Sequence, residues 1–435
     1  MHKVYIKTLG CEKNTVDSEG IAGLLQLNGI KLVDSPDKAD VFIVNTCGFI
    51  LDAKIQSIDT IFELAALKDD KKKLIVCGCL AQRYADELAL EMPEADAFVG
   101  VDDYKNLISI INGNEKERVF VGHCAKEFNE LPRKINKSHT ACLKISEGCA
   151  NVCSYCAIPL MKGRYRSRQE KDIIEEAKRL AAAGVKELVI IAQDTTYYGR
   201  DLKVKSSLPK LLKKLCKIDG IEWIRLMYCY EDEITDELIE CIKTEKKICK
   251  YIDMPIQHCN NDVLKAMNRK STHKSILKTI SKLRKEIPDI CLRTTLMVGF
   301  PGEKKKEFDE LLDFVKEVKF DRLGVFPYSK EEGTKAYSMA GQVRKDVKER
   351  RVDAIMETQR SISLHHNEEL VGKTLQVIID DIESDGIYVG RSYMDAPDID
   401  NGIMVKSEKK LKIGSLVNVR ILDAFDYDLT GETVK

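Results

Sequence analysis

The sequence predicts an α/β chain in three parts: an N-terminal doubly wound parallel sheet, a central partial (βα)6 barrel and a C-terminal small antiparallel β-barrel. Three observations predict this order. Apolar strands alternate with amphipathic helices at the start of the chain, a longer alternation of six strand–helix pairs begins near Thr140, and short strands with tight turns come last. At 435 residues, about three domains are expected. Their boundaries are expected at 1–117, 139–366 and 367–435, with a charged linker at 118–138.

The first domain is predicted from short β-rich runs that Gly, Asn or Asp residues bound. The strands are Val4–Gly10, Asp40–Thr46 and Lys73–Gly78, and helices are expected between them at Asp17–Asn28 and Lys54–Leu67. This spacing indicates a parallel sheet with helices on both of its faces.

The central domain repeats this pattern six times. Its strands are expected at Ala141–Ser146, Glu187–Gln193, Glu222–Tyr228, Lys250–Ile256, Cys291–Phe300 and Arg322–Tyr328. Six units are too few for a closed eight-fold barrel, so an open one is expected, with functional loops at the carboxyl ends of the strands. A helix at Val343–Glu368 ends the domain, and the runs TLQVIID, GIYVGRS, GIMVKS and SLVNVRILDA predict the small barrel.

Composition narrows the classes of partner. Lys plus Arg and Asp plus Glu both number 70, so bulk charge does not attract a polyanion. There is no apolar run long enough to span a membrane and no signal-peptide pattern at the start, so a cytoplasmic protein is expected. Residues 367–435 hold eight Lys/Arg and fourteen Asp/Glu, a net charge of −6. Such a domain repels a phosphate backbone and suits a basic partner, so no stable nucleic-acid binding is expected.

Cysteine is unusually frequent, with 15 residues, and both the odd count and the expected reducing compartment disfavour a disulfide framework. The sharpest motif is Cys149-Ala-Asn-Val-Cys153-Ser-Tyr-Cys156, just after the first strand of the central domain. A zinc site needs a fourth ligand, and no His follows at zinc-finger spacing. Three thiolates can instead hold three irons of a 4Fe–4S cluster and leave the fourth iron open to a small molecule.

A second set of cysteines is dispersed in sequence. Cys11, Cys47 and Cys79 each follow or end an apolar strand of the first domain. Because the carboxyl ends of parallel strands meet at one crevice, these thiols are expected to converge and to suit a second cluster with three protein ligands. Three unrelated buried thiols are the alternative, and Cys77, inside its strand, is expected only to pack.

The segment Lys162-Gly-Arg-Tyr-Arg-Ser-Arg168 places four cations in seven residues just after the first cysteine motif. A solvated charged surface is one interpretation. The other is a basic lip that grips an anionic substrate beside the open metal site.

The Cys149–Cys156 spacing resembles the radical S-adenosylmethionine enzymes, in which the open iron binds that cofactor. With the strand-end cysteines and a small final barrel of the TRAM kind, the whole chain resembles the methylthiotransferases. The segments TLGCEKNTVDSE, YIDMPIQHCNNDVLKAMNR, LRTTLMVGFPGE and APDID are most similar to the RimO type. One departure is Lys162, where an Arg is more usual.

The resemblance implies two 4Fe–4S clusters, S-adenosylmethionine and transfer of a methylthio group to the β-carbon of an aspartate in ribosomal protein twelve of the small subunit. It implies that the second cluster carries the sulfur and that a flavodoxin or ferredoxin supplies electrons. Expected cofactor contacts are Tyr155, Gln193, Gln257 and Arg293. A tRNA adenosine methylthiotransferase is the alternative within the family. A non-catalytic iron–sulfur electron carrier is a further one, disfavoured because each cysteine set supplies only three thiolates.

Overall fold

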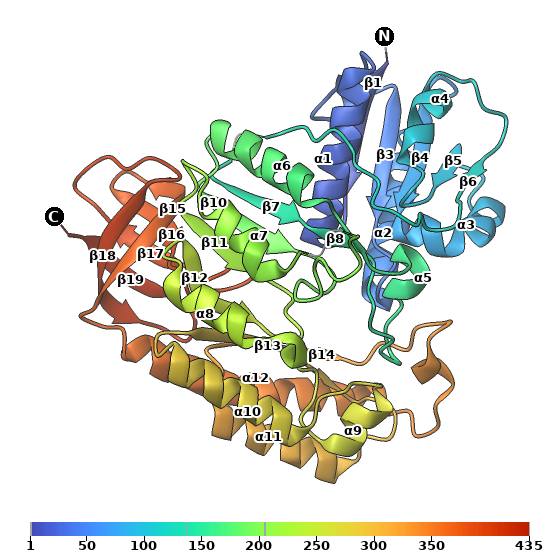
Figure 1. The fold of residues 1–435 in the computed structure, drawn as a ribbon. Helices are drawn as coiled ribbons and strands as arrows, with labels where there is room; N and C mark the ends of the chain where they lie inside the picture. The colour runs from blue at the N-terminus through green and yellow to red at the C-terminus, as the bar shows by residue number, and fades with distance from the viewer. Residues whose placement is uncertain (1, 137, 204–205, 435) are drawn as a thin grey trace. The chain divides into compact units, whose positions relative to one another are not determined.

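The computed structural model describes residues 2–136, 138–203 and 206–434, which fall into two compact units (Figure 1). The first unit contains Met1–Asn136, Ser146–Arg168 and Ser329–Ser338, and the second contains Lys137–Ile145, Gln169–Tyr328 and Met339–Lys435. The cysteine-rich loop after residue 146 therefore belongs to the same unit as the N-terminal sheet. Within the described residues, no helix is both long and apolar enough to cross a membrane.

The first unit is built on a six-stranded parallel sheet in the order β2-β1-β3-β4-β5-β6. The strands are β1 Lys3–Thr8, β2 Lys31–Leu32, β3 Val41–Thr46, β4 Lys73–Gly78, β5 Ala97–Val99 and β6 Val119–Phe120. All six residues of β3 are buried, as expected for a central strand covered on both faces. The predicted doubly wound sheet is thus confirmed.

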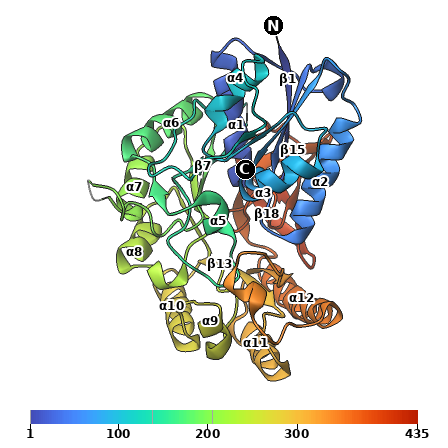
Figure 2. The same ribbon diagram turned by 90° about the vertical axis from the view of Figure 1, so that its right-hand side faces the viewer.

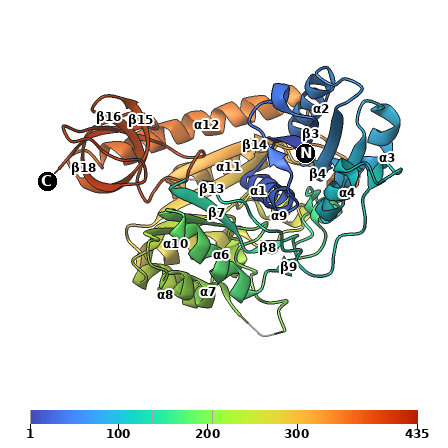
Figure 3. The same cartoon turned by 90° about the horizontal axis from the view of Figure 1, so that it is seen from above.

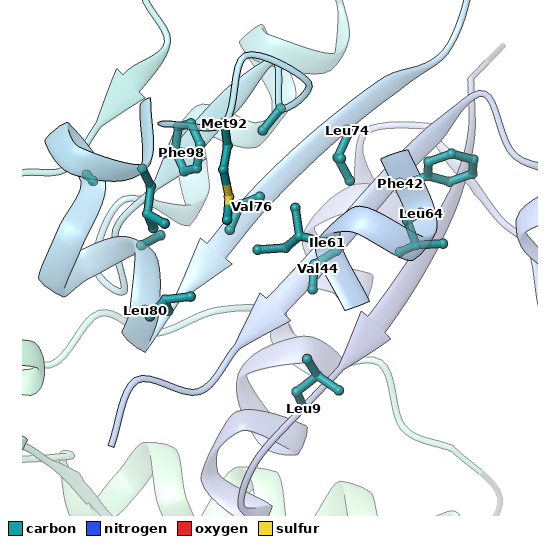
Figure 4. Close-up of a cluster of buried hydrophobic side chains, with 14 of the residues drawn as sticks. Leu9, Phe42, Val44, Ile61, Leu64, Leu74, Val76, Leu80, Met92 and Phe98 are labelled. Carbon is teal, nitrogen blue, oxygen red and sulfur yellow. The ribbon is translucent and has the colours of Figure 1, made fainter. Parts of the chain in front are cut away.

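Alternate residues of the central strands pack into two separate cores. Phe42, Val44 and Val76 face one core together with Ile61 and other apolar side chains (Figure 4). The residues between them face a second core on the opposite side of the sheet. The covering helices are α1 Glu12–Leu27, α2 Leu51–Ala65, α3 Cys79–Glu91 and α4 Leu107–Ile111, with 3-10 turns η1 Pro36–Lys38 and η2 Tyr104–Asn106.

The second unit carries a six-stranded parallel sheet whose order β14-β13-β12-β11-β10-β7 follows the chain. Its strands are β7 Thr140–Lys144, β10 Glu187–Ile191, β11 Trp223–Leu226, β12 Ile248–Asp253, β13 Cys291–Val298 and β14 Arg322–Pro327. A sheet that adds each strand beside the last without closing is an open (βα)6 barrel, as predicted.

Helices line the outside of this sheet in chain order, with α6, α7, α8 and α10 following one another (Figure 2). They are α6 Glu170–Ala182, α7 Leu208–Leu215, α8 Asp236–Thr244, α9 Asn261–Ala266, α10 His273–Glu286, α11 Lys305–Val318 and α12 Lys345–Glu368, with the 3-10 turn η3 Glu231–Glu233. Helices α8 and α10 begin where the hydroxyls of Thr235 and Thr272 accept hydrogen bonds from first-turn backbone N–H groups.

The chain ends in a closed five-stranded barrel, to which α12 leads (Figure 3). The strands are β15 Thr374–Ser384, β16 Ile387–Arg391, β17 Ile403–Lys406, β18 Leu416–Ala424 and β19 Leu429–Thr433. The small barrel is confirmed, although the sequence runs indicated four strands and the β17–β19 pair is parallel. Asn367 near the end of α12 donates hydrogen bonds to the carbonyls of Phe425 and Tyr427, which fixes the helix to the barrel.

A buried ionic seam joins the barrel to the sheet inside the second unit. Glu187, which is fully buried, accepts from Arg225 Nε at 2.7 Å and from Arg391 Nη2 at 2.8 Å. Arg225 in turn donates to the carbonyl of Tyr393 at 2.6 Å, and Arg322 pairs with Asp395 at 2.6 Å. These contacts involve the first residues of β10 and β14, so the loop between β16 and β17, called the barrel loop below, covers the amino-terminal edge of the sheet.

Candidate functional site

The three dispersed cysteines lie at the carboxyl ends of neighbouring strands of the first sheet. Cys11 precedes α1 as its N-cap residue, Cys47 directly follows β3, and Cys79 is the first residue of α3. Because β1, β3 and β4 are adjacent and parallel, their ends meet at one edge.

Close backbone approach shows how tightly these strand ends meet. A methyl group on Gly10, the neighbour of Cys11, would lie 2.8 Å from Cβ and 3.1 Å from Sγ of Cys47. One on Gly48 would lie 2.9 Å from the carbonyl oxygen of Cys79. Glycine at both positions therefore lets the three cysteine-bearing segments come together.

Asn14, in the first turn of α1, holds these strand ends in place. Its buried side chain donates to the carbonyls of Leu9 at 2.9 Å and Thr46 at 3.0 Å, and its Oδ1 lies 3.9 Å from Cys79 Sγ. Asn14 was not predicted from the sequence, although its position three residues after Cys11 was a signal for it.

Burial differs among the three thiols, because Cys79 is buried, Cys47 is half-buried and Cys11 is exposed. Desolvation by burial raises the pKa of Cys47, and it raises the pKa of Cys79 to about 12, while the ammonium of Lys162 opposes the rise at both. Thiols that converge at one sheet edge suit a metal centre, because metal charge stabilises the thiolate form. The donor set fits a 4Fe–4S cluster with one iron left open.

The second cysteine set lies in a loop closed at its base by the two-stranded hairpin of β8 Ser146–Glu147 and β9 Arg166–Ser167. Cys149, Cys153 and Cys156 are all half-buried within the loop, which continues into α5 Ile158–Lys162.

Backbone contacts shape this loop. The N–H of Cys149 donates to the carbonyl of Gly163 at 3.3 Å, and that of Cys156 donates to the carbonyl of Cys153 at 3.1 Å. The N–H of Asn151 points at Cys149 Sγ at 3.4 Å. Three half-buried thiols in one short loop also fit a cluster with one open iron.

The four expected cofactor contacts divide between the units. Tyr155 lies with the cysteines in the loop of the first unit, and the other three belong to the second. Gln193 follows the carboxyl end of β10, and Gln257 follows that of β12. Gln257 has a left-handed φ of 67°; its N–H donates to the carbonyl of Thr295 and its carbonyl accepts from the N–H of Met297, both in β13. Arg293 pairs with Asp253 at 2.8 Å and with Asp400 of the barrel loop at 3.2 Å.

The basic segment after the loop is neither a solvated surface nor an open anion grip. Three of its four cations are buried and engage carboxylates within the first unit: Lys162 with Asp17 at 2.9 Å, Arg166 with Asp102 at 2.7 Å and Arg168 with Glu130 at 2.7 Å. Both interpretations of the sequence are therefore wrong for these three. A run of charged residues in the sequence does not show which carboxylates, distant in the chain, will pair with it.

Comparison with known proteins gives three matching families in chain order. Residues 3–100 match the uncharacterized protein family UPF0004, residues 143–315 the radical SAM superfamily and residues 371–434 the TRAM domain. A ribosomal protein uS12 methylthiotransferase RimO of Thermoanaerobacter sp. (strain X514) is 51% identical over 99% of this chain and 100% of the relative. The protein of the same name from Clostridioides difficile (strain 630) is 50% identical over 100% and 99%.

Solved structures show a shared fold at low identity. The radical S-adenosylmethionine methyltransferase TsrM from Kitasatospora setae has a TM-score of 0.57 at 13% identity, covering 86% of this chain and 80% of that one. The cobalamin-dependent S-adenosylmethionine radical enzyme OxsB has a TM-score of 0.53 at 12% identity, covering 83% and 58%.

Proposed function

Because this chain belongs to the RimO family of ribosomal protein uS12 methylthiotransferases, we propose that it transfers a methylthio group to the β-carbon of an aspartate in uS12. The observation that carries the proposal is the convergence of Cys11, Cys47 and Cys79 at one sheet edge, in the same compact unit as the Cys149–Cys156 loop. Full-length identity of 51% to a relative of that name supports it.

Each cysteine set would hold one 4Fe–4S cluster. Cys149, Cys153 and Cys156 would leave one iron open for S-adenosylmethionine, and Cys11, Cys47 and Cys79 would leave one open for the sulfur to be transferred. When bound, the Cys149–Cys156 cluster and S-adenosylmethionine would supply one-electron chemistry able to remove hydrogen from a carbon that acid–base groups cannot activate.

The side chains around the two cysteine sets would orient the thiols, keep water from them and contact the cofactor. Asn14 holds the ends of β1 and β3 at the spacing the three thiols need. The apolar contacts of Cys79 with Ala157 and Met161 keep water from this thiol. Tyr155, Gln193 and Gln257 are the proposed cofactor contacts from the loop and the strand ends. Arg293 is the fourth candidate, and its pairs with Asp253 and Asp400 also give it a structural task.

The partners follow from charge and from the family. The barrel domain, with a net charge of −6 over residues 367–435, would dock a basic ribosomal protein and repel RNA. We further propose a flavodoxin or ferredoxin as reductant, a cytoplasmic location, and functional domains at 1–117, 139–366 and 367–435 joined by the linker 118–138.

Intact masses of small-subunit ribosomal proteins test the proposal. Cells that lack the gene are complemented with the wild-type chain, with Cys79→Ala, or with Cys77→Ala as the matched control, because Cys77 is a core residue of β4 only two residues before Cys79. A methylthio mass increment on uS12 is expected with the wild type and Cys77→Ala, and its loss with Cys79→Ala. An unchanged uS12 in all strains would overturn the proposal, and methylthio loss from tRNA nucleosides would establish the tRNA alternative instead.

A further inference from the structure

Lys162 is a buried cation that belongs to the loop of one cysteine set and contacts the segment of the other. It is the last residue of α5, and only 4% of it is exposed. Its Nζ lies 2.9 Å from Asp17 Oδ2 and 3.6 Å from Glu147 Oε2. Asp17 stands on α1, six residues after Cys11, whereas Glu147 stands two residues before Cys149.

The backbone fixes Lys162 relative to the Cys149–Cys156 loop. The next residue, Gly163, accepts the hydrogen bond from the N–H of Cys149 at 3.3 Å. The preceding residue, Met161, packs with Cys79 in one buried apolar cluster and accepts from Cys124 Sγ at 3.5 Å. The backbone of Lys162 is therefore fixed on both sides by residues that contact a cysteine of one set or the other.

Lys162 lies among the residues that hold the strand-end cysteines. Met161, the residue before it, packs with Cys79, and its own ammonium contacts Asp17 on α1, the helix that Cys11 caps. A three-thiolate 4Fe–4S cluster bears negative charge and becomes more negative when reduced. A buried cation beside it stabilises the reduced state, since low local polarity strengthens the attraction.

We propose that Lys162 is a positioning residue that ties the Cys149–Cys156 loop to the strand-end cysteines and, through its fixed positive charge, raises the reduction potential of the cluster they hold. This inference rests on the proposed function, because it requires a cluster at Cys11, Cys47 and Cys79. It assigns Asp17 the opposite electrostatic effect, since its carboxylate shares that environment and partly neutralises the ammonium.

The test isolates the strand-end cluster in the full-length chain by replacing Cys149, Cys153 and Cys156 with Ala. The midpoint potential is measured by spectroscopic titration, and iron retention is measured against a chelator. Lys162→Met is expected to shift the potential to more negative values and to speed iron loss, whereas Lys162→Arg keeps the charge and should stay near the parent value. Asp17→Asn should shift the potential the opposite way, a reversal of sign that a purely structural role would not produce.

Lys73→Met is the matched control, since Lys73 starts the strand β4 that leads into Cys79 and its Nζ contacts the carbonyl of Ile110 at 2.8 Å. This change removes a cation from the far end of the same strand, so no shift is expected. Equal potentials in Lys162→Met and the parent, or equal shifts in Lys162→Met and Lys73→Met, would overturn the inference alone. If Lys162→Met does not fold, the Asp17→Asn shift decides by its sign. A parent that binds no cluster would overturn both this inference and the proposed function.

Discussion

Replacing Gly10 by Ala tests whether the strand-end cysteines are as closely placed as the structure indicates. Gly10 has φ +86°, a left-handed conformation that costs a residue with Cβ about 1–2 kcal/mol. The added methyl group would also lie 2.8 Å from Cys47 Cβ and 3.2 Å from Asn14 Nδ2. Overpacking of this kind costs a further ~1–3 kcal/mol, so the total loss of unfolding free energy is about 2–5 kcal/mol.

Gly29→Ala separates the two contributions. Gly29 belongs to the same unit and has φ +72°, but nothing lies within 4 Å of an added methyl group. It should show only the cost of the backbone conformation, about 1–2 kcal/mol. The assays are urea unfolding of the apo chain and iron content after reconstitution.

The two variants should also differ in iron content. Gly10→Ala pushes Cys47 away from Cys11, so the iron content is expected to fall from about eight per chain towards about four, while Gly29→Ala keeps the full amount. Equal stability and equal iron in the two variants would refute the close approach of Gly10 to Cys47, and with it the convergence of the three thiols.

Three further predictions concern the clusters and the second unit. Cys153→Ala should halve the iron content, from about eight to about four per chain, and combining it with Cys79→Ala should remove nearly all iron; full iron in either single variant would contradict the two-cluster assignment. Glu187→Gln should lower the unfolding free energy by about 3–5 kcal/mol, because Arg225 and Arg391 lose a buried carboxylate, while Glu286→Gln in an exposed pair should leave the urea midpoint unchanged. Burial lowers the pKa of His258 from 6.5 to about 3, so as the pH falls the unfolded chain protonates this imidazole before the folded chain does. The stability that the neutral side chain contributes above pH 6.5 should therefore be lost as the pH falls towards about 3. A His258→Gln variant whose unfolding free energy falls with pH as steeply as that of the wild type would exclude this cause.

Sequence patterns predicted the longer strands of the two parallel sheets because each of them is an apolar run with its own boundaries, whereas the two- and three-residue strands β2, β5 and β6 were not predicted. The helix expected at Val343–Glu368 is observed at Lys345–Glu368, and the strand expected at Lys73–Gly78 has the observed limits. Helix α1 was the larger error: expected from Asp17, it begins at Glu12, because its buried first turn is polar and shows no apolar periodicity.

The sequence by itself determined the order of the folds and the positions of both cysteine sets, since strand ends and the Cys149–Cys156 spacing are local features of the chain. Only the tertiary structure decided what the charged residues do. Lys162 and Asp17 are 145 residues apart, and Arg391 and Glu187 are 204 residues apart, yet both pairs are buried. The local sequence around a cation is the same whether water solvates it or a distant carboxylate pairs with it, because its partner is set by the topology of the chain.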